Sequence, residues 1–258
     1  MGYETVLVER KEHIGIITLN RPEKLNTFNI PLGRDLNASL DELEGDRDVY
    51  VVIIRANGRV FSAGIDISDF PKKGILEYRP WIALMEKMTL TIAKMRKPVI
   101  AAVHGVAAAN GAGLVAAADL AIATEGARFG LTAIDVGLFC MGPAVPMDRC
   151  VGKKHCLELL LTGDLIDAHR AERIGLVNKV VPEERLMDEA IALAKKLSAK
   201  SPLALQMGKE SYYTMADMPL EKALQYSNEM FSELCTLKDA EEGVRAFLEK
   251  RPPKWRME

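Results

Sequence analysis

The chain has 258 residues, of which 48% are hydrophobic, and a formal net charge of −2. This composition is typical of a globular protein, and it lacks the basic excess that would indicate a nucleic-acid or membrane-surface partner. The charged N-terminal segment has no apolar signal-peptide core, the four cysteines form no CxxC pair, and the four histidines add no metal-site spacing. We therefore expect a cytoplasmic protein with reduced thiols and without structural zinc.

The first third of the chain alternates between strand and helix patterns. Apolar spacing predicts a β-hairpin, a helix, a buried strand and a long amphipathic helix at residues 4–9 with 14–19, 30–43, 50–54 and 78–95. Between the last two elements, residues 61–67 run from an extended segment through small residues into a helical turn. Gly64 permits backbone conformations closed to other residues, and Ser62 and Asp66 can bind locally.

The stretch 98–119 is built mostly of small residues. A β-branched run at 98–103 predicts a strand that stops at His104, and Asn110 and Gly111 precede the helix-prone residues 114–118. Small residues at a strand–turn–helix junction let the backbone come close to a ligand. The N-terminus of the helix would present free N–H groups at that point.

This stretch allows three functional hypotheses. Residues 99–118 carry no formal charge, as in a membrane span, but they have few Leu, Ile or Phe to drive insertion. Residues 111–116 fit the dinucleotide motif G-x-G-x-x-A, but the strand expected at 120–124 begins too soon for a full helix. The third hypothesis is a turn that directs backbone N–H groups at a developing oxyanion, with a second N–H from residues 61–67. A small-residue helix packed in a core is the alternative without a function.

The remaining chain changes from mixed α/β to helical near residue 183. We expect a strand at 120–124, a turn at 126–130, a helical or irregular segment at 132–136 that leads into 137–143, helices at 153–162 and 168–173, and a strand at 176–181. The last third predicts helices at 185–198, 202–214, 220–234 and 238–250. The expected domains are therefore an α/β core, 1–183, and a helical region, 184–258.

Several segments together resemble the crotonase superfamily, the enoyl-CoA hydratase/isomerase family, along nearly the whole chain. The matching segments are ITLNRPEKLN at 17–26, FSAGIDI at 61–67, KPVIAAVHG at 97–105, LTGD at 161–164 with residues 168–177, and EEGVRAFLEKR at 241–251. The resemblance implies an α/β crotonase (ClpP-like) spiral of β-β-α units. It also implies a C-terminal helical region that assembles a homotrimer, commonly a hexamer formed as a dimer of trimers.

The resemblance implies an acyl-CoA thioester as the ligand and no separate cofactor, because coenzyme A is part of the substrate. The thioester carbonyl oxygen would lie between the amides of Ala63 and Asn110, where Asn110 replaces the family's usual Gly. Other residues that would border the CoA or the acyl group are Lys24, Leu25, Ile65, Asp66, Ile67, Gly111, Gly113, Ala133, Met141 and Trp255. Trp255 would reach a CoA on this or a neighbouring subunit.

The sequence departs from the family pattern at the acid–base positions. Family hydratases use two glutamates to activate water, and the matching positions here are Gly113 and Ala133, neither of which can carry a proton. Ordinary hydration is therefore expected to be poor, since general acid–base groups typically contribute on the order of 10²–10⁴-fold. The small side chains also suggest room for a bulkier acyl chain. Asp135 is the candidate replacement, and further candidates are Asp69, Cys140 and His104, for all of which structural roles are the alternative.

The sequence therefore predicts an acyl-CoA enzyme that works through an enolate. Hydration or dehydration, a lyase reaction of fatty acid metabolism, is the commonest reaction of this sequence type. Decarboxylation, double-bond isomerisation and thioester hydrolysis share the same intermediate and are alternatives. A non-catalytic acyl-CoA-binding paralogue is the third possibility.

Overall fold

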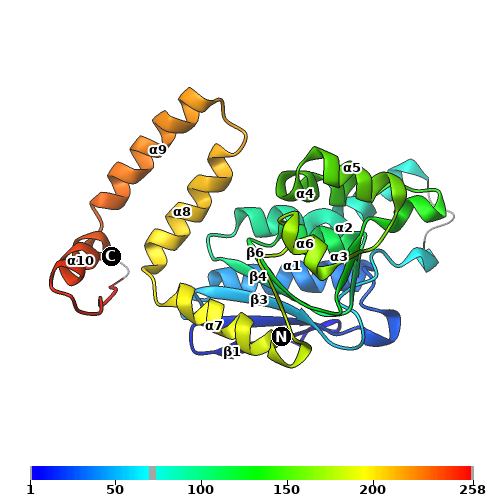
Figure 1. Cartoon of the computed structure of the whole chain (residues 1–258), viewed down its shortest axis with the longest axis horizontal. Helices are drawn as coiled ribbons and strands as arrows, with labels where there is room; N and C mark the ends of the chain where they lie inside the picture. Colours follow the sequence, from blue (N-terminus) through cyan, green and yellow to red (C-terminus); the bar gives the residue numbers. More distant parts are fainter. Residues whose placement is uncertain (1, 70–73, 257–258) are drawn as a thin grey trace.

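The computed structural model describes residues 2–69 and 74–256, which form a twisted sheet flanked by helices and a helical C-terminal part (Figure 1). The larger sheet has the order β1-β2-β3-β4-β6-β9. Its strands are β1 (Val6–Lys11), β2 (Ile14–Leu19), β3 (Val51–Ala56), β4 (Val99–Val103), β6 (Leu120–Thr124) and β9 (Lys179–Val181). β1 and β2 form the expected antiparallel hairpin, and the other neighbours are parallel.

Both faces of this sheet are buried, because alternate residues of each strand enter different clusters. On β3, Val52 and Ile54 pack with α1 (Ile30–Gly45) and α2 (Ile75–Lys94), whereas Val51 and Ile53 pack with α7 (Leu186–Ser198). This two-residue period explains why the parallel strands read as continuous apolar runs.

The smaller sheet was not predicted from the sequence, and one of its strands belongs to the small-residue stretch 98–119. It pairs β5 (Val106–Ala108), β7 (Arg128–Gly130) and β8 (Ile166–Asp167) in the order β5-β7-β8. The prediction of a turn at 126–130 is wrong for its second half. Strands of two or three residues are too short to show an apolar period, and their pairing depends on tertiary contacts.

Four short helices follow the central strands. They are α3 (Asn110–Ala117), α4 (Met141–Val151), α5 (Lys153–Thr162) and α6 (Ala168–Arg173), with 3₁₀ turns η1 (Pro22–Lys24), η2 (Ile67–Asp69), η3 (Thr132–Val136) and η4 (Glu183–Arg185). α4 was not predicted, because Gly142, Pro143 and Pro146 are unfavourable for helices. Pro143 is tolerated because it lies in the first turn, where a backbone N–H has no helical partner.

The membrane and dinucleotide hypotheses do not fit the structure. Residues 99–118 divide into β4, β5 and α3, and no helix within 2–69 and 74–256 is both long enough and apolar enough to cross a membrane. α3 ends at Ala117, and β6 begins at Leu120, so no full nucleotide-binding helix separates the strands.

The C-terminal helices α8 (Pro202–Met215), α9 (Leu220–Cys235) and α10 (Lys238–Leu248) project from the α/β part (Figure 1). The expected boundary after residue 183 precedes α7, which packs on the sheet. The change in packing therefore comes later, between α7 and α8. α8 is joined to the core through Asp119, which accepts hydrogen bonds from Lys209 Nζ (2.7 Å) and Tyr213 Oη (2.9 Å).

Candidate active site

The loop 61–67 is held along both edges by backbone hydrogen bonds. On one edge, Ser62 N donates to Val106 O (3.1 Å) and Ser62 O accepts from Ala108 N (2.9 Å). On the other edge, Gly64 O accepts from Phe28 N (2.7 Å) and Asp66 N donates to Phe28 O (2.9 Å). The loop is therefore fixed before any ligand arrives.

The structure contradicts Ala63 as an oxyanion donor. Ala63 N already donates to Leu25 O at 3.0 Å. Leu25 adopts a left-handed conformation (φ 52°), which belongs to the turn that presents this carbonyl. The Ala63 amide therefore holds two loops together and is not available to a substrate.

The available amide in this loop is that of Ile65. Because Gly64 O and Asp66 N both face Phe28, the N–H of Ile65 faces the opposite edge of the loop, toward the start of α3. No hydrogen bond of this N–H is found among the described residues. Gly64 (φ 100°) lies so close to α3 that a β-carbon on it would be 2.8 Å from Ala109 Cβ and 3.7 Å from Asn110 N.

The second available amide is that of Asn110, the first residue of α3. The first helical bond runs from Gly113 N to Ala109 O (2.9 Å), so the N–H of Asn110 precedes the helical ladder. It also lacks a hydrogen-bond partner in the described part of the chain. Ala109 has φ 48° and ψ −115°, which is strained for a residue with a β-carbon, and its own N–H donates to Gly130 O.

The Asn110 side chain does not compete with this amide. Asn110 is buried, and its Nδ2 donates to Met85 O on α2 at 3.1 Å. The asparagine that replaces the expected glycine therefore fastens α3 to α2. Gly111 is buried against Ser62 O, where a β-carbon would clash, so the two loops meet backbone to backbone.

The space beside Gly113 is filled, which contradicts the idea of extra acyl room at this position. A β-carbon on Gly113 would lie 3.0 Å from Pro143 Cβ and 3.1 Å from Pro143 Cα. Ala133 is partly buried and packs on the main core cluster. Pro143 of α4 thus occupies the place into which a longer side chain at position 113 would extend.

The structure does not bring Asp135 to the two amides. Asp135 is exposed on η3, and its carboxylate lies against Gly163 at the end of α5. A β-carbon on Gly163 would be 2.8 Å from Asp135 Oδ1. Cys140 is buried, and burial raises the pKa of its thiol, which disfavours the reactive thiolate. His104 Nε2 donates to Gly58 O at 2.7 Å, and the side chain of Asp69 lies outside the described part of the structure.

The predicted CoA-binding residues fall into two groups. The first group belongs to the joined loops beside the amides and consists of Lys24, Leu25, Ile65, Asp66 and Ile67. The second group lies elsewhere: Met141 is exposed at the start of α4, and Trp255 contacts the C-terminal part of the chain. Trp255 Nε1 donates to Ala199 O (2.9 Å), and its ring lies against Gly243 of α10.

The Asp66 carboxylate stabilises the loop pair. It forms an ion pair with Arg21 at 3.1 Å and accepts a hydrogen bond from Ser68. Burial alone would raise the pKa of Asp66, but the hydrogen bonds from Ser68 and Arg21 lower it overall. The side chain is therefore already paired and stays ionised.

Glu86 is a half-buried carboxylate on α2 that the sequence did not indicate as a candidate site residue. It follows Met85, and burial raises the pKa of its carboxyl. The only available signal was its place next to Met85 and Met88, which lie on the buried face of a predicted amphipathic helix.

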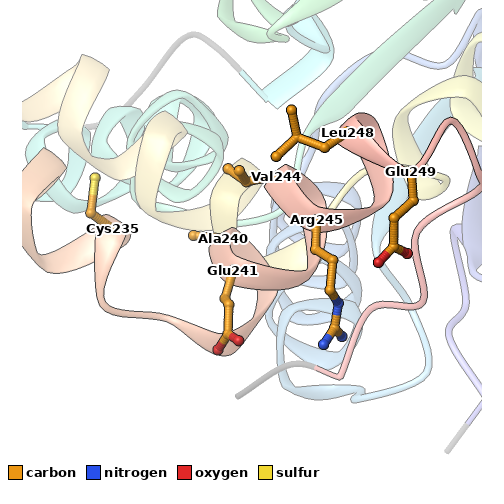
Figure 2. A pocket seen from close by; sticks show the side chains of 7 residues that line it. All are labelled: Cys235, Ala240, Glu241, Val244, Arg245, Leu248 and Glu249. Atoms are coloured by element: carbon orange, nitrogen blue, oxygen red, sulfur yellow. The ribbon is translucent and has the colours of Figure 1, made fainter.

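A separate hollow lies among the C-terminal helices. Cys235, Ala240, Val244 and Leu248 line it on α9 and α10, with charged side chains at its edge (Figure 2). It shares no residue with the Ile65–Asn110 region.

A family model described as enoyl-CoA hydratase/isomerase matches residues 9–258. This chain belongs to the enoyl-CoA hydratase/isomerase family. It is 38% identical over 252 residues to a probable enoyl-CoA hydratase of Rhizobium meliloti, with 97% of each chain covered. It is 34% identical over 255 residues to the mitochondrial enoyl-CoA hydratase domain-containing protein 3 of Rattus norvegicus, covering 98% of this chain and 85% of the relative.

Solved structures of the family share the fold. An enoyl-CoA hydratase of Mycobacterium smegmatis matches with a TM-score of 0.95 and 37% identity over 98% of this chain and 99% of its own. Human enoyl Coenzyme A hydratase domain-containing protein 3 matches with a TM-score of 0.94 and 33% identity over 98% and 100%. The crotonase fold expected from the sequence is thereby confirmed.

Proposed function

We propose that this family member binds an acyl-CoA thioester and stabilises its enolate between the amides of Ile65 and Asn110. The observation that supports this most is the pair of N–H groups without a hydrogen-bond partner in the described structure, which belong to two fixed segments that meet where Gly64 approaches Ala109. Preorganised amides stabilise charge that develops on a thioester oxygen, and removing one donor of a comparable oxyanion hole costs roughly 2.7–4 kcal/mol.

The same loops would hold the CoA. Lys24 and Ile67 are exposed next to Leu25 and Asp66, so a long polar ligand can lie along them while its thioester reaches the amides. CoA enters with the substrate, and the proposal requires no other cofactor.

The proposed reaction is an enolate reaction other than standard two-glutamate hydration. Gly113 and Ala133 cannot carry protons, and Pro143 fills the space beside Gly113. Double-bond isomerisation, decarboxylation and thioester hydrolysis each need a different set of groups around the same enolate.

The test is incubation with a panel of acyl-CoA thioesters, read by mass spectrometry, with binding measured by calorimetry. Gain of the mass of water would indicate hydration, and loss of the mass of CO₂ would indicate decarboxylation. We expect saturable binding of acyl-CoA and turnover of at least one thioester. Binding without turnover would support the non-catalytic alternative, and absence of binding would overturn the proposal.

We also propose that the C-terminal helices assemble a homotrimer, alone or as half of a hexamer. Apolar side chains at helical spacing are exposed on α9 (Leu220, Leu224, Phe231) and α10 (Val244, Phe247, Leu248), and Phe247 is 82% exposed. We call these six residues the C-terminal apolar face. A surface of this kind is typical of an interface between copies of a chain.

The oligomer is tested by light scattering of wild type and of Phe247→Glu. We expect a wild-type trimer or hexamer and a smaller species for Phe247→Glu, because a charge in an apolar interface is costly. Lys222→Glu, an exposed change on α9, is the matched control and should assemble normally. A monomeric wild type at micromolar concentration would contradict the proposal.

A further inference from the structure

Glu86 follows the residue of α2 that binds the Asn110 side chain. Its neighbour Met85 provides the carbonyl that accepts Asn110 Nδ2 at 3.1 Å. The side chain that fixes Asn110 is therefore anchored one residue before Glu86. Any movement of α2 that displaced Glu86 would also disturb the residue that presents the amide.

A second set of contacts connects Glu86, through α4, to α3, the helix that begins at Asn110. The carboxylate lies against Gly142, where a β-carbon would overlap both the Glu86 oxygens and Cδ. The next residue, Pro143, packs on Gly113 of α3. Gly113 is one helical turn after Asn110, on the same face of α3. The contacts thus form a closed ring in the order Asn110, Met85–Glu86, Gly142–Pro143 and Gly113.

The Glu86 carboxylate is unusual among the half-buried acids. Asp66 is paired with Arg21, and Asp119 is paired with Lys209. For Glu86, neither an ion pair nor a hydrogen bond is found within residues 2–69 and 74–256, and burial raises the pKa of its carboxyl. A carboxylate whose pKa is raised in this way accepts a proton more readily than a paired one.

We propose that Glu86 is the catalytic acid–base residue of this site, and that it shifts the double bond of a β,γ-unsaturated acyl-CoA thioester. This proposal rests on the proposed acyl-CoA function. In this proposal, Glu86 takes the place of the two glutamates that are missing at positions 113 and 133. A single carboxylate is sufficient for this reaction, because it removes one proton from C2 and returns one to C4, and its own proton exchanges with solvent between the two steps.

The proton transfer balances without water or a further reagent. The C2–H bond breaks, its proton goes to the Glu86 carboxylate, and its electron pair forms the C1–C2 double bond of a dienolate. The carbonyl π pair moves to the oxygen, where the Ile65 and Asn110 amides stabilise it. The Glu86 O–H bond then breaks, a C4–H bond forms, and the C1 carbonyl returns with the double bond between C2 and C3. The product is the conjugated isomer.

The test compares wild type, Glu86→Gln and Glu77→Gln with 3-hexenoyl-CoA in D₂O. Conjugation is followed by absorbance, deuterium at C2 and C4 by mass spectrometry, and affinity by calorimetry. Glu77→Gln is the matched control, because it makes the same change at an exposed position of α2. We expect Glu86→Gln to lose turnover and deuterium uptake by on the order of 10²–10⁴-fold, with affinity changed little and Glu77→Gln close to wild type.

Two results would overturn the role of Glu86 and leave the proposed binding function intact. One is wild-type turnover that Glu86→Gln retains, including the case in which this variant only lowers Tm. The other is a wild type that binds 3-hexenoyl-CoA and neither isomerises it nor exchanges its protons. Failure of the wild type to bind any acyl-CoA would instead overturn the proposed function itself.

A second variant tests the geometry. Gly142→Ala adds a β-carbon that overlaps the Glu86 carboxylate, and Gly142 lies in α4 with an ordinary helical backbone that alanine can adopt. We expect the variant to fold and bind acyl-CoA, and to lose at least tenfold of the isomerisation rate. An unchanged rate would contradict the placement of Glu86 beside the substrate.

Discussion

The loops around the two amides and the C-terminal helices use their surfaces in opposite ways. In the loop pair, Ser62, Ala63 and Gly64 exchange backbone hydrogen bonds with two neighbouring segments, and two N–H groups remain unused at the centre. In the C-terminal part, α9 has no buried residue in the isolated chain, and its apolar side chains face outward. Under the proposed function, the first region is complete within one chain and binds the acyl-CoA, whereas the second would be covered by another copy of the chain.

The C-terminal helices are joined to the α/β core by a buried ion pair, and its removal should have the largest effect. Asp119 binds Lys209 and Tyr213 of α8 and also accepts a hydrogen bond from Val99 N. Burial lowers the pKa of Lys209, and the Asp119 charge partly opposes this shift. Asp119→Ala should lower the free energy of unfolding by about 3–5 kcal/mol, measured by urea denaturation, because it leaves a buried ammonium without its partner.

The double variant Asp119→Ala/Lys209→Met is the control for that prediction. Removing both charges should recover part of the loss, since no unpaired ammonium remains. If Asp119→Ala unfolds with the same midpoint as wild type, the helices do not depend on this link to the core.

The next largest effect distinguishes the amides of Ala63 and Ile65, which lie two residues apart in one loop. Ile65→Pro removes an N–H without a partner and should lower the turnover rate by on the order of 10²–10³-fold with little change in Tm. Ala63→Pro removes the bond to Leu25 and should mainly lower Tm. Ile65→Val keeps the amide and should behave as wild type. Loss of turnover in Ala63→Pro at unchanged stability would reverse the assignment.

The sequence supported the fold and most long elements, but it selected the Ala63 amide, which the structure shows bonded to Leu25 O. The hairpin, α1, α2 and the C-terminal helices have strong apolar periods, so their positions were predictable. The choice between Ala63 and Ile65 depends on which carbonyls face the loop, and Leu25 and Phe28 are far from it in sequence. The contact of Gly142 with Glu86 arises where α2 and α4 meet, and no local pattern indicates it.

A smaller effect concerns strain at the start of α3. Ala109→Gly should raise the free energy of unfolding by about 1 kcal/mol, because glycine adopts φ 48° and ψ −115° without a β-carbon clash. Chemical denaturation measures the change, and Ala116→Gly within α3 is the control, which should be destabilising. A destabilised Ala109→Gly would show that position 109 is not strained.

The smallest effect is local and lies in the C-terminal tail. Hydrogen bonds from Arg251 and Arg245 hold the pKa of Glu242 well below its usual 4.5. A depressed carboxyl pKa stabilises the fold above the unfolded value, and this contribution is lost as the pH falls through the lower folded value. In a Trp81→Phe background, Trp255 fluorescence should therefore stay native down to pH 4.5 and change only in stronger acid.

Glu242→Gln tests the origin of that acid transition. The variant should loosen the tail already at neutral pH, because the two arginines lose their ionised partner, whereas the exposed Glu241→Gln should titrate as wild type. An identical fluorescence titration in Glu242→Gln would exclude Glu242 as the controlling group.

The central claim is that the Ile65 and Asn110 amides hold one thioester oxygen. A crystal structure with a bound, non-hydrolysable acyl-CoA analogue tests it most directly. The account predicts that both N–H groups donate to the carbonyl oxygen while Ala63 N keeps its bond to Leu25 O. An analogue whose oxygen lies away from these amides, or that takes the Ala63 N–H from Leu25, would contradict it.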